Sequence, residues 1–138
     1  MIEKIINHIR NHSYMDGVNR TNLRVKFSAE VFTPTKLVQE ILDQLPEILF
    51  SDPTKTIFDP TCGDGQFLGE ALIRKMENGI DFETALSHIY GMDLMSDNVK
   101  LCQDRLLCGF EEFRPIVEKN ITVGDALELG KMKQPKLF

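Results

Sequence analysis

The alternation of apolar and polar segments predicts an α/β fold in which helices cover a parallel sheet. Three short apolar runs have the length of buried strands: residues 56–59, 89–92 and 121–123. Segments long enough for amphipathic helices separate them, and this strand–helix alternation is typical of parallel sheets. An acidic residue stands at or just after the end of each run, at Asp59, Asp93 and Asp125. We therefore expect a polar edge where the carboxyl ends of the strands meet, which is where such sheets bind ligands.

The amino-terminal part predicts two helices separated by a loop. One apolar face with helical spacing comprises Ile2, Ile5, Ile6 and Ile9. Residues 13–30 are polar and contain glycine, so they predict a loop or hinge. Thr33 suits a helix N-cap, with Pro34 at the first helical position. The apolar face of this second helix comprises Leu37, Val38, Ile41, Leu42 and Leu45.

Three further helices are predicted between and beside the strands. The first covers residues 66–78 and is stopped by Gly79, because glycine favours the backbone that ends a helix. Asp81 caps a short helix that extends to about Ser87. Ser96 caps a longer helix that runs to Cys108.

The most informative segment is Asp-Pro-Thr-Cys-Gly-Asp-Gly-Gln-Phe-Leu at residues 59–68. It predicts a strand end, a glycine turn and a helix, which together place a carboxylate beside free backbone N–H groups. A ligand with both an ammonium and a carboxylate, such as the methionine part of S-adenosylmethionine, fits this environment. A dinucleotide fingerprint is a poor match, because its third glycine would fall on Leu68, and no P-loop sequence occurs. An ordinary glycine turn remains an alternative for this segment alone.

Three other segments accompany it: Val31-Phe32-Thr33-Pro34, Ile89-Tyr90-Gly91-Met92-Asp93 and Asn120-Ile121-Thr122-Val123-Gly124-Asp125-Ala126-Leu127. With these four segments in this order, the chain resembles the S-adenosylmethionine-dependent adenine-N6 DNA methyltransferases whose cofactor motifs precede the catalytic motif. The resemblance extends from about Val31 to the last residue. It implies a partial Rossmann-like methyltransferase sheet with parallel strands in the order 3-2-1 and an N-terminal helical segment.

The resemblance also implies a role for each residue at the polar edge. Asp59 would receive the ammonium of S-adenosylmethionine, Asp93 the ribose hydroxyls, and Asp125 the exocyclic amine of its adenine. The glycine turn would approach the cofactor with its backbone, and Phe32 and Thr33 would close over the methionine end. The complete set of cofactor-binding residues is Phe32, Thr33, Asp59, Pro60, Thr61, Cys62, Gly63, Gly65, Phe67, Asp93, Leu94, Asp125 and Ala126.

Some of these residues have simpler interpretations. Asp93 suits a solvated strand end, Asp125 a turn, and Thr33 a helix cap alone. Cys62 suits a small residue that fills the turn, because no base that could activate a nucleophile accompanies it in the sequence.

The motif that carries the chemistry in this family, Asn/Asp-Pro-Pro-Tyr/Phe, is not found in the sequence, since no two of the six prolines are adjacent. We therefore expect no catalytic residues here, and a chain that stops before strand four. We divide it into an N-terminal helix and basic loop (residues 1–30) and an S-adenosylmethionine-binding subdomain (residues 31–138). Without strand four, residues 55–59 would form an open sheet edge. That edge predicts self-association or a second polypeptide that carries the catalytic half.

Composition limits the remaining possibilities. With 138 residues, of which 42% are hydrophobic, the chain supports one core. There is no apolar run of membrane-spanning length and no signal-peptide pattern, which predicts a cytoplasmic protein. The three cysteines and three histidines form no metal-ligand pattern, so no metal is expected.

Charge is unevenly distributed along the chain. Residues 1–36 carry six Lys/Arg and three acids, whereas the remainder carries ten and eighteen. Only the amino-terminal part, especially residues 20–26, is basic enough for contacts with DNA phosphates, and a solvated arm explains it equally well.

Three functions stay open at this point. The first is the cofactor-binding portion of an adenine-N6 DNA methyltransferase, as a fragment or half of a split enzyme that is inactive alone. The second is a non-enzymatic S-adenosylmethionine-binding or interaction protein derived from such an enzyme. The third is a methyltransferase for another substrate, which the Phe-Thr-Pro and Asp-Pro-Thr-Cys-Gly segments disfavour.

Overall fold

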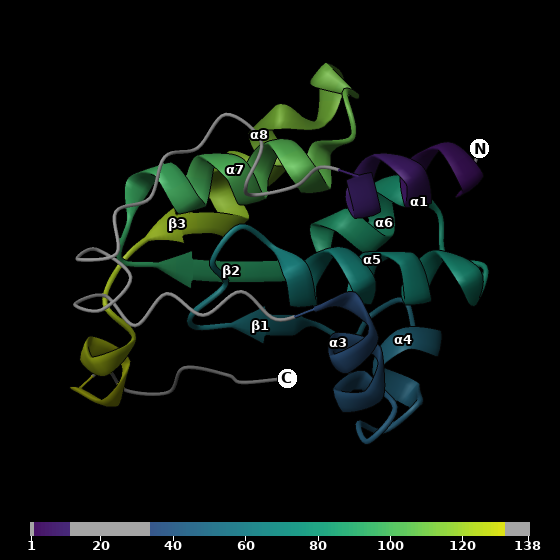
Figure 1. Cartoon of the computed structure of the whole chain (residues 1–138), viewed down its shortest axis with the longest axis horizontal. Helices are drawn as coiled ribbons and strands as arrows, with labels where there is room; N and C mark the ends of the chain where they lie inside the picture. The colour runs from purple at the N-terminus through teal and green to yellow at the C-terminus, as the bar shows by residue number, and fades with distance from the viewer. Residues whose placement is uncertain (1, 12–33, 132–138) are drawn as a thin grey trace.

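The computed structural model describes residues 2–11 and 34–131, which contain a three-stranded sheet flanked by helices (Figure 1). The strands are β1 (Ile57–Asp59), β2 (Ile89–Asp93) and β3 (Ile121–Val123). They lie in the order β1-β2-β3, and both neighbouring pairs are parallel. The predicted α/β class and strand order are confirmed, and the strand boundaries differ from the prediction by at most one residue.

The register of the strands staggers their carboxyl ends. Asp59, the last residue of β1, pairs with Gly91, so β2 continues for two residues beyond β1. Asp93, the last residue of β2, pairs with Val123 at the end of β3. The carboxyl ends of β2 and β3 are therefore level and lie two residues beyond that of β1, and Asp59, Asp93 and Asp125 follow one another along this stepped edge.

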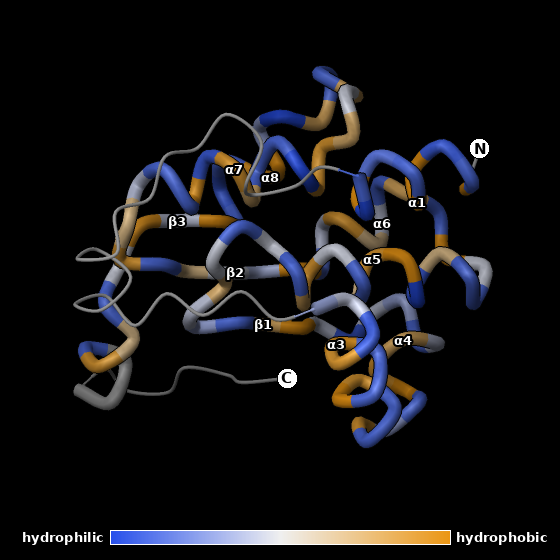
Figure 2. Tube along the Cα trace, in the orientation of Figure 1, coloured by the Kyte–Doolittle hydropathy of each residue, from blue (hydrophilic) through white to orange (hydrophobic). Residues whose placement is uncertain are grey.

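The helices are α1 (Ile2–Asn11), α3 (Thr35–Leu42), α4 (Ile48–Ser51), α5 (Gln66–Glu77), α6 (Phe82–Ser87), α7 (Ser96–Leu107) and α8 (Arg114–Asn120). Two 3-10 turns, η1 (Glu111–Phe113) and η2 (Ala126–Lys131), complete the elements of the described residues. The helix α5 contacts β1 and β2, and α7 contacts β2 and β3. Figure 2 shows hydrophobic residues on α3 and α4, both of which pack against α5.

Two predicted caps are confirmed and two helix starts are shifted. The Asp81 side chain accepts a hydrogen bond from the Thr84 N–H, 3.0 Å away, at the start of α6. Gly79, with φ of 92°, follows the end of α5. Pro34 occupies the N-cap position of α3 instead of its first helical position, and Ser96 is the first residue of α7 instead of its cap. The prediction of a Thr33 cap and most of the predicted loop at 13–30 lie outside the described residues.

The helices α4 and α8 were not predicted. The helix α4 has four residues and α8 has seven, which is too short for a helical apolar pattern to stand out.

The helix α1 is part of the core. Its predicted face is buried through Ile5 and Ile9, each 1% exposed, and it packs against α5 and α7. Arg10 forms two hydrogen bonds with the buried Glu70 of α5, of 3.0 and 2.9 Å. The amino-terminal helix is therefore fixed to the two helices that cover the sheet.

A buried lysine fixes the segment that leads into β1. Lys75 of α5 is fully buried, and its Nζ donates to the carbonyl oxygens of Leu49 and Lys55 at 3.2 and 2.7 Å. Burial lowers the pKa of Lys75. These two hydrogen bonds use two of the three donors of the buried ammonium and hold the chain that enters β1 against α5.

Gly69→Ala is expected to destabilise the protein, which tests the docking of α1. A Cβ at Gly69 would lie 2.6 Å from Cγ2 of Ile9. Such overpacking costs about 1–3 kcal/mol. If α1 did not pack against α5 at this place, the same change would stabilise α5 by up to about 1 kcal/mol, because alanine has a higher helix propensity than glycine. The sign of the change in the free energy of unfolding, measured by urea denaturation, therefore decides whether α1 lies here.

Candidate functional site

The turn between β1 and α5 has a backbone that requires glycine. Gly63 and Gly65 have φ of 56° and 95°, in the left-handed region that other residues rarely adopt. A Cβ at Gly65 would also lie 3.0 Å from Sγ of Cys102. The Cys62 N–H donates to the carbonyl of Met92 at 2.8 Å, which attaches the turn to the end of β2. The Asp-Pro-Thr-Cys-Gly-Asp-Gly segment thus forms the expected turn.

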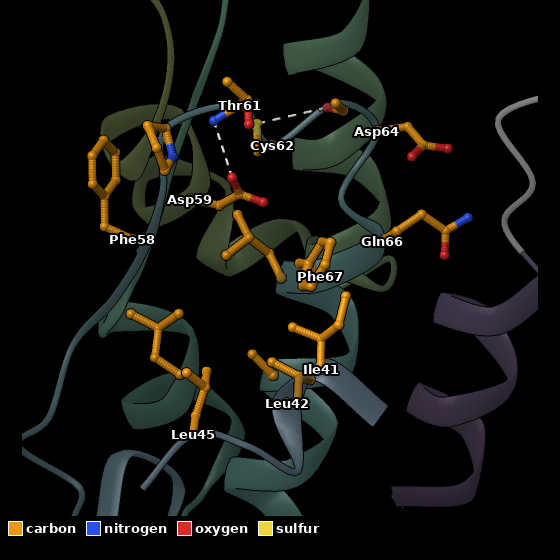
Figure 3. Close-up of a pocket in the computed structure, with 15 residues that line it drawn as sticks. Ile41, Leu42, Leu45, Phe58, Asp59, Thr61, Cys62, Asp64, Gln66 and Phe67 are labelled. Carbon is orange, nitrogen blue, oxygen red and sulfur yellow. Dashed lines mark hydrogen bonds between the residues drawn. The ribbon is translucent and has the colours of Figure 1, made fainter. Parts of the chain in front are cut away.

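A cavity of about 330 Å³ opens beside this turn (Figure 3). Its walls come from β1, the turn, α5 and the segment around α3. Figure 3 shows Asp59 and Thr61 toward one end and Ile41, Leu42 and Leu45 at the other, so the cavity has a polar and an apolar end. The lining residues are Ile41, Leu42, Leu45, Ile57, Phe58, Asp59, Pro60, Thr61, Cys62, Gly63, Asp64, Gln66, Phe67, Leu68 and Ala71.

Asp59 supplies a carboxylate to this cavity. Its Oδ1 accepts a hydrogen bond from the Thr61 N–H at 3.0 Å. Burial raises the pKa of Asp59, and the charge of nearby Asp93 raises it further, against the opposing effect of the Thr61 hydrogen bonds. A positively charged ligand group at this place would offset both unfavourable effects, so the geometry favours a cation such as an ammonium.

Asp93 joins the ends of two strands to the turn. Its Oδ2 accepts from the Gly63 N–H at 3.0 Å, and its Oδ1 accepts from the Met95 N–H at 2.9 Å and from Asn98 Nδ2 at 3.2 Å. Its backbone carbonyl accepts from the Gly124 N–H at 2.9 Å. The carboxylate of Asp93 therefore connects the glycine turn, the residues after β2 and the start of α7 by hydrogen bonds.

Asp125 lies just beyond the carboxyl end of β3. Its Oδ1 accepts from the Leu127 N–H at 2.9 Å, in the turn that follows β3. Leu94, next to Asp93, is 57% exposed, and Val123 at the end of β3 is 55% exposed. An apolar surface therefore lies beside the carboxylates of β2 and β3.

The structure brings part of the predicted set into the cavity. Six of its residues line the cavity: Asp59, Pro60, Thr61, Cys62, Gly63 and Phe67. The cavity does not extend to the others that are described, which are Gly65, Asp93, Leu94, Asp125 and Ala126. Phe32 and Thr33 lie outside the described residues. Gly63 links the cavity to the ends of β2 and β3, because it lines the cavity and its N–H donates to Asp93.

Several lining residues were not predicted as part of a site. Ile41, Leu42 and Leu45 were assigned to the apolar face of a helix, and that face turns out to form the apolar wall. Asp64 and Gln66 lie inside the predicted turn segment, where only their neighbours were singled out. Exposure of Ile41, at 38%, shows that this face is not completely covered.

Neither a metal site nor a membrane-spanning helix is found in the described part of the chain. Among residues 2–11 and 34–131, no group of three or more His, Cys, Asp or Glu side chains could hold a metal ion. In the same residues, no helix has both the length and the apolar character needed to cross a membrane.

Comparison with known proteins gave one family. The family model described as "N-6 DNA Methylase" matches residues 19–136, which is well over half of the chain and includes the turn, the cavity and all three strands. No curated protein and no solved structure matched.

Proposed function

Because the chain belongs to the N-6 DNA methylase family, we propose that it is the S-adenosylmethionine-binding portion of a DNA adenine-N6 methyltransferase. The family acts on DNA and generally uses this cofactor. The observation that carries the proposal is the position of Asp59, a carboxylate with a raised pKa at the polar end of an otherwise apolar cavity beside a glycine turn. When bound, the cofactor supplies a methyl group carried on a sulfonium sulfur.

In this proposal Asp59 binds the ammonium of the methionine part. Pro60, Thr61, Cys62 and Gly63 border it through the turn, and Phe67 forms part of the wall beneath it. A cavity of about 330 Å³ is at the lower limit of ordinary ligand pockets. It therefore takes the methionine part, and the nucleoside extends along the stepped edge.

The nucleoside would then meet Asp93 and Asp125. A carboxylate has about four acceptor positions, and hydrogen bonds from Gly63, Met95 and Asn98 use three of those of Asp93. We infer that Asp93 accepts one ribose hydroxyl at Oδ2. Asp125 would accept from the adenine amine, with Leu94 and Ala126 against the ring. Phe32 and Thr33 remain predicted to close over the methionine end.

The open edge of the sheet supports the proposal of a partner. The strand β1 is at the edge of the described sheet, and it has β2 on one side only. We propose that a strand from a second polypeptide, which carries the catalytic half, pairs with β1; a second copy of the chain is the other candidate. In the complete enzyme DNA is the substrate.

The 138 residues contain no Asn/Asp-Pro-Pro-Tyr/Phe motif, so we expect this chain alone to transfer no methyl group. The test is incorporation of labelled methyl groups from S-adenosylmethionine into adenine of duplex DNA. The purified chain should give none, and a polypeptide with the missing motif should restore incorporation. Incorporation by the chain alone would contradict the proposal, because it would require an active site among residues that we assign to the cofactor.

A further inference from the structure

The cofactor turn is held by a buried arginine on a different helix. Arg105 of α7 lies behind the turn, where its Nη1 approaches Oδ2 of Asp64 at 3.4 Å and the Asp64 carbonyl oxygen at 3.4 Å. Asp64 stands between Gly63 and Gly65, the two residues with positive φ. The ion pair therefore acts at the centre of the turn, next to the residue that donates to Asp93.

Because both partners of this ion pair are buried, the pair favours the one backbone conformation of the turn in which it can form. Arg105 is 2% exposed and Asp64 is 1% exposed. A charge taken out of water must be compensated by an opposite charge and by hydrogen bonds, and removing one partner leaves the other uncompensated. Glycine permits the left-handed backbone of the turn but does not select it, because glycine also adopts many other conformations. Arg105, as a fixed partner of Asp64, favours the left-handed conformation over the others that glycine allows.

The same guanidinium also binds the amino-terminal helix. Its Nε donates to the carbonyl oxygen of Ile9 at 2.8 Å. Ile9 lies in the last turn of α1, where helix carbonyls lack partners within the helix. Its side chain is 1% exposed and packs against Gly69 of α5. One side chain thus connects α1, α7 and the turn, although these segments are far apart in the sequence.

We propose that Arg105 is a positioning residue, which fixes the cofactor turn through Asp64 and couples the turn to the docking of α1. The inference rests on the proposed cofactor site and adds to it a residue outside that site. Loss of the guanidinium releases Asp64 from its buried position, so that the N–H groups and carboxylate around the turn no longer keep the arrangement that binds the cofactor. The expected effect is a weaker affinity without the loss of any group that touches the cofactor.

Arg10 provides a matched control. It is also an arginine that connects α1 to the core, but its hydrogen bonds within the described residues go to Glu70 of α5 and not to the turn. Arg10→Met and Arg105→Met each remove one such tie. Both variants are expected to lower the melting temperature, whereas only Arg105→Met should raise the dissociation constant for S-adenosylmethionine, by about tenfold. Titration calorimetry at a temperature where all variants are folded measures the constants.

Amide hydrogen exchange without cofactor supplies an independent readout. The Gly63 and Gly65 amides donate to Asp93 and to the Cys62 carbonyl, and the Ile57 amide donates to His88 and reports unfolding of the sheet. Relative to Ile57, the two turn amides should exchange about tenfold faster in Arg105→Met and at an unchanged rate in Arg10→Met. If wild-type protein binds no cofactor, the proposed function fails, and this exchange measurement still decides the positioning role.

Arg105→Lys decides the question if Arg105→Met does not fold. Lysine keeps the charge but lacks the planar fork that reaches Asp64 and Ile9 together. It should therefore show the same faster exchange at the turn with a smaller loss of stability. The proposal is overturned if a folded Arg105 variant binds the cofactor as tightly as wild type, or if its turn amides exchange no faster than those of Arg10→Met.

Discussion

Asp59→Asn is expected to weaken S-adenosylmethionine binding by at least about thirtyfold. Truncating one partner of a hydrogen-bonded charge pair that is removed from water costs about 2–5 kcal/mol. Asparagine keeps an oxygen for the Thr61 N–H, so the turn retains its hydrogen bond and only the charge is lost. Titration calorimetry on wild type and variant at one pH measures the difference.

Asp52→Asn is the control for this substitution. Asp52 makes the same type of turn, since its Oδ1 accepts from the N–H of the residue two positions later, Thr54, at 2.9 Å. It changes the net charge equally and does not line the cavity. Its affinity for the cofactor should equal that of wild type, and a similar loss in both variants would assign the effect to net charge.

The pH dependence of binding has a definite sign. The ammonium requires the ionised form of Asp59, so affinity is complete above the pKa of Asp59 and is lost as the pH falls through it. Burial raises that pKa, so the loss begins at a higher pH than for an ordinary aspartate. Titrations below about pH 7 keep the ligand amine protonated. Asp59→Asn should remove this dependence, while Asp52→Asn should retain it.

Asp93→Asn is expected to reduce both affinity and stability. Within the described residues, the carboxylate accepts hydrogen bonds from three donors in the wild type: Gly63 N–H, Met95 N–H and Asn98 Nδ2. An asparagine amide would turn an N–H₂ group toward at least one of them, and each hydrogen bond to a charged group contributes about 1.5–3 kcal/mol. The lost ribose contact corresponds to about ten- to hundredfold in the dissociation constant.

Asp81→Asn is the control that separates the effect of Asp93→Asn on affinity from its effect on stability. Asp81 also accepts a backbone N–H at the start of a helix, but it caps α6 and does not line the cavity. It should lower the melting temperature and leave the affinity unchanged. If Asp93→Asn behaved in the same way, the assignment of Asp93 to the ribose would be wrong and its role would be structural.

The sequence predicts those parts of this fold that depend on neighbouring residues. The strands were predicted because each is a short apolar run, and the turn was predicted because glycines and an acid follow β1 directly. The α6 cap was predicted because aspartate is a preferred N-cap residue, and the N–H that it accepts belongs to Thr84, only three positions later. In each case the interaction that forms the element lies within a few residues.

Contacts between distant residues could not be predicted in this way. Arg105 lies 41 positions from Asp64 and 96 from Ile9, and nothing near it in the sequence indicates that its side chain is buried. The apolar wall from α3 was likewise predicted only as the apolar face of a helix, because such a face has the same pattern whether it meets another helix or an open cavity. Such features depend on how the elements pack.

The central claim is that the cavity beside β1 binds S-adenosylmethionine, and calorimetric titration of the wild-type chain with this cofactor tests it most directly. We predict saturable binding with one cofactor per chain, and competition by free methionine at the same site, because the cavity takes that part of the molecule. A chain that is folded by circular dichroism and gives no binding heat at several temperatures would contradict the claim.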